Sequence, residues 1–153
     1  MFVLAAEHII RARGKRMRVA LAASLIVLIA GGQAHSQNSG LQIELNKLER
    51  RETSCRAYLV FANRTESEFS SLKLDLVVFD PDGIVAERVA IEAAPLAAGK
   101  ITLKVFDIDG LPCERISKIL LNEVLNCGDS HGQREDCIAA IELVAKGAVQ
   151  FVK

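Results

Sequence analysis

Tryptophan is absent from the sequence, and tyrosine occurs once, as Tyr58. A platform of aromatic rings that stacks on sugars or nucleic-acid bases is therefore not expected. Of the three histidines, only His131 lies beyond residue 36. A Ser-His-Asp triad needs a positioned histidine and transition metals favour imidazole ligands, so the chain has little material for either chemistry. We interpret His131 as a solvated loop residue.

Motifs for nucleotide binding and redox chemistry are also missing. The chain has no Gly-rich phosphate loop, no dinucleotide fingerprint and no nucleophile elbow. No two cysteines have the Cys-x-x-Cys spacing, which speaks against a thioredoxin-like role. We therefore predict no catalytic residues and no cofactor.

The first 36 residues have the composition of a secretory signal. Five basic residues lie within residues 11–18, and residues 19–30 carry no charge. A basic region, an apolar stretch of about 7–15 residues and a small-x-small site define a signal peptide. The site here is Ala34-His35-Ser36. We predict a signal-peptide helix within residues 1–36, cleaved between Ser36 and Gln37.

Three alternatives stay open for this segment. Cleavage could follow Ala34, or translation could begin at Met17, because Arg18 leads directly into the apolar run. The run could also be retained as an anchor, although it is shorter than the ~20 residues of a membrane span. We predict one domain over residues 37–153, with no stable membrane span after processing.

Removal of the signal changes the charge of the protein. The whole chain has 19 basic and 19 acidic residues, and residues 1–36 hold five basic residues and one acidic residue. The remainder has 14 against 18, a net charge of −4. Nucleic acids and anionic membranes attract clustered Lys and Arg, so we expect neither as a partner.

All four cysteines follow the signal: Cys55, Cys113, Cys127 and Cys137. An even number in an exported domain favours two disulfides and a periplasmic or secreted location. Free buried thiols are one alternative. A zinc site is another, but the close ligand pairs that are usual in zinc sites are lacking.

Alternation of apolar and polar residues predicts strands at 41–46, 54–63, 72–78, 84–93 and 101–105, because a period of two places one face in a core. In the strand at 72–78 the leucines face one way, with Lys73 and Asp75 opposite. Residues 48–53 and 128–136 are predicted to be polar connections. We expect two further strands, at 137–145 and around 149–151.

Residues 112–126 fit two structures. We favour a short helical turn at 112–116 followed by a strand to Leu125, and a single longer helix is the alternative. Short strands separated by turns indicate an all-β fold. We predict an Ig-like antiparallel β-sandwich of about seven strands.

Strand direction favours one of the three possible cysteine pairings. Cys55 begins the second strand and Cys113 follows the fifth, which places both at one end of a sandwich. Cys127 ends the sixth strand and Cys137 begins the next, at the opposite end. We therefore expect the pairs Cys55–Cys113 and Cys127–Cys137. A single helix would hold Cys113 and Cys127 about 21 Å apart, beyond the reach of a disulfide.

An internal repeat of Asp-x-Asp-Gly ends two of the predicted strands. Its candidate calcium ligands are Asp80, Asp82, Asp107 and Asp109. A full calcium loop needs further acidic ligands at fixed spacing, and neither copy has them. We interpret both copies as capped turns. Separately, Asn63-Arg64-Thr65 matches a glycosylation sequon.

Four segments carry a resemblance to a group of exported proteins: residues 55–65, 72–83, 95–100 and 106–113. Together they resemble small alphaproteobacterial proteins labelled "Tat pathway signal sequence domain protein". The resemblance implies export, and it implies no catalytic residues. The basic region has no adjacent arginines before its apolar run, which favours general secretion over the twin-arginine route.

These observations favour a non-catalytic binding or structural module over an enzyme. Its expected partner is a protein of the envelope that adds a strand to an exposed sheet edge. The alternatives are a hydrolase that works with acidic residues and a calcium-stabilised domain.

Mass spectrometry of the exported protein tests the processing and the disulfides together. We expect a mature chain that begins at Gln37 and whose four cysteines react with an alkylating reagent only after reduction. A protein that begins at residue 1, or that reacts before reduction, would contradict these expectations.

Overall fold

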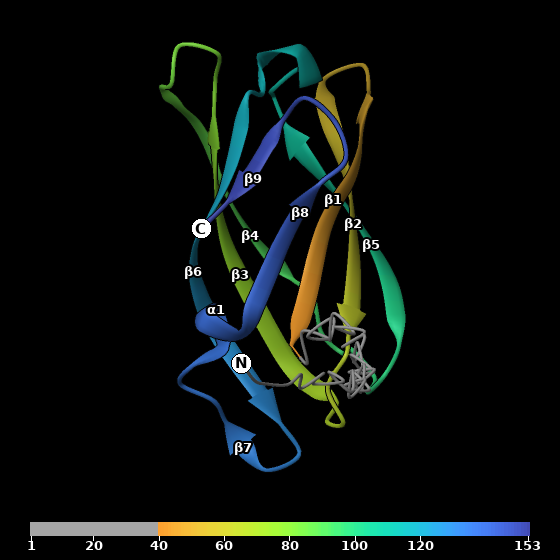
Figure 1. Ribbon diagram of the computed structural model, residues 1–153. Helices are drawn as coiled ribbons and strands as arrows, with labels where there is room; N and C mark the ends of the chain where they lie inside the picture. The colour runs from red at the N-terminus through yellow and green to blue at the C-terminus, as the bar shows by residue number, and fades with distance from the viewer. Residues whose placement is uncertain (1–39) are drawn as a thin grey trace, which may run out of the picture. The chain divides into compact units, whose positions relative to one another are not determined.

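A computed structural model describes residues 40–153, and these residues form a β-sandwich (Figure 1). The predicted signal peptide, Met17 and the cleavage site at Ser36 and Gln37 lie outside the described residues. The described residues contain no helix long and apolar enough to cross a membrane. In chain order, the elements are β1 (Leu41–Arg50), β2 (Ser54–Asn63), β3 (Phe69–Phe79), β4 (Val85–Glu92), β5 (Ile101–Asp109), η1 (Cys113–Arg115), β6 (Lys118–Asp129), β7 (Gly132–Gln133), α1 (Cys137–Ala140), β8 (Ile141–Ala145) and β9 (Gln150–Val152).

The first sheet has the strand order β5-β2-β1-β8. β2 lies between β1 and β5 and pairs antiparallel with both. Its odd-numbered residues from Cys55 to Phe61 are buried, as the alternation predicted. β8 pairs with β1 in parallel, which a purely antiparallel sandwich does not have. β5 therefore forms one edge of this sheet, and β8 forms the other.

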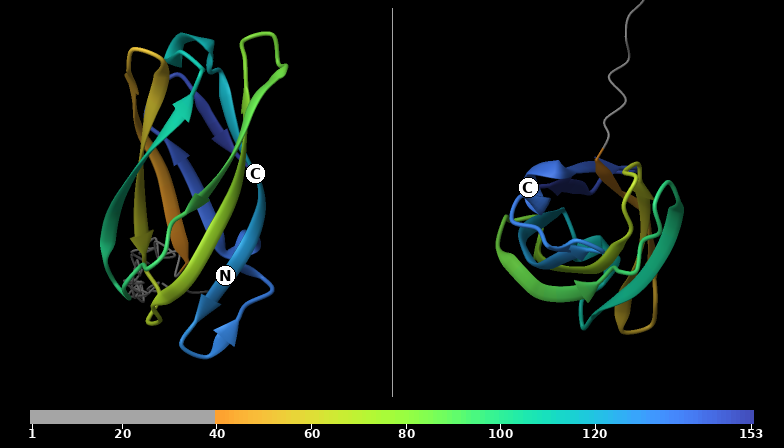
Figure 2. Two further views of the ribbon diagram at one scale, coloured as in Figure 1. Left: turned by 180° about the vertical axis from the view of Figure 1, so that it is seen from behind. Right: turned by 90° about the horizontal axis from the view of Figure 1, so that it is seen from below.

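The second sheet has the order β4-β3-β6-β7, with β9 parallel to β6. The two sheets face each other across one apolar interior (Figure 2). β3 contributes Leu72, Leu74, Leu76 and Val78 to that interior. The predicted β-sandwich is confirmed, and so is a short helical turn near 112–116, which is η1.

Three local predictions differ from the structure. Residues 48–50 belong to β1, which continues past an irregularity between Leu45 and Lys47. β6 continues to Asp129 and turns back into β7, where a polar loop was predicted. Residues 137–140 form the helical turn α1 and not the start of a strand. The alternative of one long helix after residue 112 was wrong, because β6 begins at Lys118.

Asp75 is buried, although it lies on the face of β3 opposite the core leucines. Its side chain is 3% exposed. Arg88 donates through Nε and Nη2 to its two carboxylate oxygens at 2.8 and 2.9 Å, and Asn122 donates to Oδ2 at 2.7 Å. The Arg88 guanidinium lowers the pKa of Asp75, and the Asn122 amide contributes to the same shift. The three side chains link β4, β3 and β6 on the outer face of their sheet.

The lowered pKa of Asp75 predicts that the free energy of unfolding falls at acid pH. Because the pKa of Asp75 is lower in the folded chain than its ordinary 3.8, the charged form favours folding. That stability is fully present above about pH 4 and is lost as the pH falls through the folded-state value. Asp75→Asn should lower the free energy of unfolding at pH 7 and reduce its decline in acid, measured by urea unfolding. The exposed Asp109→Asn is the control, and an unchanged acid dependence in Asp75→Asn would contradict the assignment.

Candidate functional site

β5 is the least protected sheet edge among the described residues. Proteins protect edge strands by making them short, charged or irregular. β7, β8 and β9 have two, five and three residues. β4 carries Glu87, Arg88 and Glu92, and its register with β3 shifts near Phe79. β5 has nine residues, pairs with β2 in one unbroken register, and lies at the outside of its sheet in Figure 1.

The ladder between β2 and β5 determines which backbone groups face the open edge. Asn63 donates its N–H to the carbonyl of Lys100, and Gly110 donates to the carbonyl of Thr53. Hydrogen-bonded and non-bonded pairs alternate along an antiparallel ladder. The even-numbered residues of β5 therefore bond to β2. The N–H and C=O groups of Ile101, Leu103 and Val105 point away from β2, toward the edge at which no described strand pairs.

The same three residues expose their side chains on the outer face of the sheet. The exposed fractions are 75% for Ile101, 55% for Leu103 and 46% for Val105. Across the ladder they lie opposite Ala62, Val60 and Tyr58 of β2, which are half-buried. We call the three β5 residues the edge stripe. An exposed apolar patch with a polar rim marks an interaction surface.

An ion pair bounds the edge stripe at one end. Arg56 of β2 donates through Nε and Nη2 to the two carboxylate oxygens of Asp107, each at 2.8 Å. Paired donation of this kind is geometrically specific. The Arg56 guanidinium lowers the pKa of Asp107. Next to this pair, Tyr58 donates to Glu49 at 3.1 Å and the Lys47 ammonium lies 5.1 Å from the Tyr58 ring centre.

A broad hollow of about 610 Å³ adjoins that end of β5, and three arginines lie among its lining residues. Each of the three arginines forms an ion pair with an acidic side chain, so their positive charges are compensated. The pairs are Arg50 with Glu114, Arg51 with Glu49 and Arg56 with Asp107.

The four calcium candidates occupy two separate turns. Asp80 Oδ1 accepts the backbone N–H groups of Asp82 and Ile84, each at 2.9 Å, and Arg115 donates to its Oδ2 at 3.2 Å. Asp80 therefore caps its turn. Asp107 is paired with Arg56, and Asp109 lies exposed at the end of β5. Within residues 40–153 no three His, Cys, Asp or Glu side chains are grouped to hold a metal ion.

Two disulfides connect the cysteines. Cys55–Cys113 joins the start of β2 to η1, with 4.8 Å between the Cα atoms. Cys127–Cys137 joins the end of β6 to α1, with 6.5 Å between the Cα atoms. These are the two pairs that strand direction favours. Because all four cysteines are bonded, none is a free thiol and none is available as a zinc ligand. Stable disulfides are typical of an oxidising, extracytoplasmic compartment.

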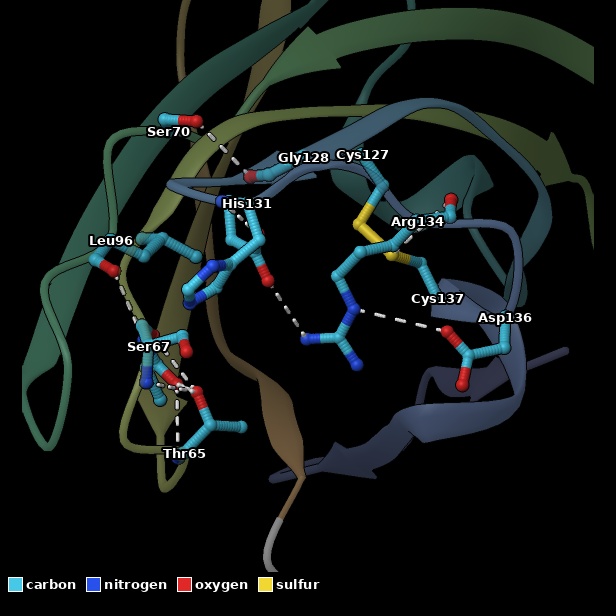
Figure 3. A network of polar contacts seen from close by, with 12 residues as sticks. Thr65, Ser67, Ser70, Leu96, Cys127, Gly128, His131, Arg134, Asp136 and Cys137 are labelled. Atoms are coloured by element: carbon cyan, nitrogen blue, oxygen red, sulfur yellow. Dashed lines mark hydrogen bonds and ion pairs between the residues drawn. A yellow bond between two sulfur atoms is a disulfide. The ribbon is translucent and has the colours of Figure 1, made fainter.

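A polar network at one end of the sandwich holds the loop that carries His131 (Figure 3). Arg134 lies 3.9 Å from Asp129 and 3.8 Å from Asp136, and its backbone N–H donates to the carbonyl of Cys127 at 2.9 Å. His131 is exposed, and its backbone N–H donates to Asp129 Oδ1 at 2.7 Å. The network orders the β6–β7 turn around the Cys127–Cys137 disulfide.

Asn63 of the sequon is buried inside the same end of the molecule. Its amide nitrogen donates to the carbonyls of Ser67, Leu96 and Ala97 at 2.9, 3.0 and 3.2 Å. Its Oδ1 accepts from the backbone N–H and the hydroxyl of Thr65. The side chain joins two loops and offers no free amide to a modifying enzyme.

Sequence reasoning identified the strand that contains the edge stripe, but not its exposure. The reason is that β5 is apolar on both faces: Phe106 and Ile108 turn toward the interior while Ile101, Leu103 and Val105 turn outward. Within residues 101–105 the pattern misleads, because the polar Thr102 and Lys104 occupy the inward positions. The local signal lies further along the strand, where Asp107 and Asp109 alternate in step with the stripe.

No protein-family model and no curated protein matches the chain. A solved structure of IrmA from Escherichia coli is similar in fold, with a TM-score of 0.53. The match covers 68% of this chain and 90% of that chain, at 11% sequence identity. At this identity the similarity concerns the β fold alone.

If the edge stripe serves binding and not folding, its truncation should leave stability intact. We expect Leu103→Ala to change the free energy of unfolding by about 0.5 kcal/mol or less, as is usual at exposed positions. Leu59→Ala, on the buried face of the neighbouring strand, should cost about 2–5 kcal/mol. Urea unfolding with the disulfides intact measures both. A large loss in Leu103→Ala would show that the stripe belongs to the core.

Proposed function

We propose that this protein is a non-catalytic binding module of the periplasm or the extracellular space, and that it takes up an extended segment of a partner at β5. The observation that carries the proposal is the coincidence, on three residues, of open backbone groups and exposed apolar side chains. In strand addition, backbone hydrogen bonds supply affinity and alternate side chains supply specificity. The edge stripe offers both on one strand.

The disulfides and the composition of residues 1–36 support the proposed location. Two disulfides join all four cysteines and brace both ends of the sandwich. A signal peptide and general secretion would bring the chain to the compartment in which such bonds persist. Membership in the group of small exported proteins that the sequence resembles is part of the same proposal.

Four of the described carboxylates are held in the charged form by their partners, which suits ion pairing better than acid catalysis. A general acid of a hydrolase needs a raised pKa. The carboxyl groups of Glu49, Asp75, Asp107 and Glu114 instead have lowered pKa values, held there by hydrogen bonds to Lys47, Arg88, Arg56 and the backbone N–H of Glu114. Three of the four serve ion pairs that join neighbouring strands or loops.

Photocrosslinking in the native envelope tests the proposed site. A photoreactive amino acid in place of Leu103 should give a crosslinked adduct, because a docked strand would lie within reach of that side chain. The control position is Leu125, an exposed leucine of β6 with 46% exposure. Adducts at Leu103 and not at Leu125 support the site. Equal yields at both positions, or none at either, contradict it.

A further inference from the structure

We infer that the segment taken up at β5 is the β5 strand of a second copy of this chain. This inference rests on the proposed function and identifies the partner of that same edge. The two strands run antiparallel about a two-fold axis at Leu103. The order of side chains along β5 is complementary to itself in one register.

In this register Leu103 lies opposite Leu103 of the second copy, and Ile101 lies opposite Val105. Every outward-facing pair in the centre of the contact is therefore apolar. On the inner side, Thr102 lies opposite Lys104 of the second copy. Asp107 falls opposite Gly99 of the second copy, so its ion pair with Arg56 is left in place.

The neighbouring symmetric registers place charges badly. A two-fold axis at Lys104 sets two lysines directly opposite each other, and like charges at such positions destabilise a sheet. An axis at Val105 sets Leu103 against Asp107 and Ile101 against Asp109. That arrangement would set carboxylates directly against apolar side chains and remove the apolar pairs from the centre of the contact. An axis at Thr102 sets Lys100 against Lys104. Charge thus disfavours these three registers. An axis at Ile101 would set Leu103 against Gly99 in the turn before β5 and lose the central apolar pairs, so Leu103 is the best centre.

The backbone of the edge stripe fits the same register. The N–H and C=O groups of Ile101, Leu103 and Val105 face the open edge, so the three pairs they form are hydrogen-bonded pairs. Each such pair exchanges two bonds, which gives about six across the contact. The half-buried Val60 and Ala62 of both copies would flank the joined stripes on the outer face.

Pairing through β5 also closes the assembly. The opposite edge of the sheet is β8, which has five residues, and a two-fold contact uses the same edge of both copies. Two four-stranded sheets become one continuous sheet without open-ended growth. A contact confined to one strand edge is at the low end of specific interfaces, at or below about 1,200 Å² in total. The dimer should therefore be reversible and depend on concentration.

Cysteine trapping tests the register. Opposite residues of a hydrogen-bonded pair have Cα atoms about 5.5 Å apart, which is within the range of a disulfide. Leu103→Cys should therefore form a covalent dimer under mild oxidation. Val105→Cys, two residues away on the same face, should not link to itself, but should link to Ile101→Cys when the two variants are mixed. Leu125→Cys controls for random collision.

The mature wild-type protein provides the second measurement. Sedimentation equilibrium should give a mass that rises from one chain to two with concentration, and Leu103→Lys should stay monomeric while Leu125→Lys should not. Amide hydrogen exchange should show the odd-numbered amides of the edge stripe exchanging fast when dilute and slowly when concentrated.

Each outcome decides the inference. A covalent dimer of Leu103→Cys with a concentration-dependent wild-type mass supports it. A wild-type protein that stays monomeric at all concentrations overturns it. If that monomer still gives adducts with another protein from Leu103 in the envelope, the proposed function stands and only the second copy is wrong. If it gives none, both fail.

Discussion

The hydrogen-bond ladder between β2 and β5 is the interaction on which the exposed surface of this protein depends. β2 is anchored on both sides, and its inward side chains from Cys55 to Phe61 are buried. Because β5 pairs with β2 in one unbroken register, the orientation of every β5 residue follows from its number. The alternation that turns the even-numbered Ile108 into the core turns the odd-numbered Leu103 out to solvent and aims its amide at the open edge.

The edge strands of this sandwich are protected from further pairing in different ways. β4 is charged, and its outer face is held by the buried carboxylate of Asp75. β8 is short and follows α1, whose carbonyls accept hydrogen bonds from the ammonium of Lys153. β5 alone among the longer described strands combines length, regularity and apolar side chains at an edge. A chain that leaves such an edge open in a crowded compartment risks unspecific association, so a specific occupant is the simplest physical reason for it.

Much of the fold could be predicted from local pattern. β2 begins at Ser54 and ends at Asn63 as its alternation indicated, since one face is wholly apolar. The turn at Asp80 followed from its Pro and Gly. The errors arose where tertiary contacts override pattern. Residues 137–140 are apolar and lead directly into the strand at 141–145, but the disulfide from Cys137 to Cys127 and the hydrogen bonds from Lys153 accompany a helical turn there. Asp75 lies at an outward position of β3, where the pattern predicts exposure, but its contacts with Arg88 and Asn122 bury it.

The candidate site could be predicted only in part, because edge status is a property of sheet order. Nothing local to residues 101–105 says that β5 has a neighbour on one side only. That information comes from β8, almost forty residues later, which takes the place beside β1 at the other end of the sheet. The apolar alternation of β5 is the same whether its face is buried or exposed, so the strand was identified while its role was not.

The buried amide of Asn63 has a practical consequence for making this protein. Its sequon is complete, and a eukaryotic secretory host attaches glycans to nascent chains before they fold. A glycan at that nitrogen would remove a donor that bonds to three carbonyls, and would have to occupy a place between two packed loops. Such a chain could not close this end of the sandwich. Recombinant material made in yeast or animal cells would therefore be held back as unfolded glycoprotein, whereas a host without that modification would release the folded domain.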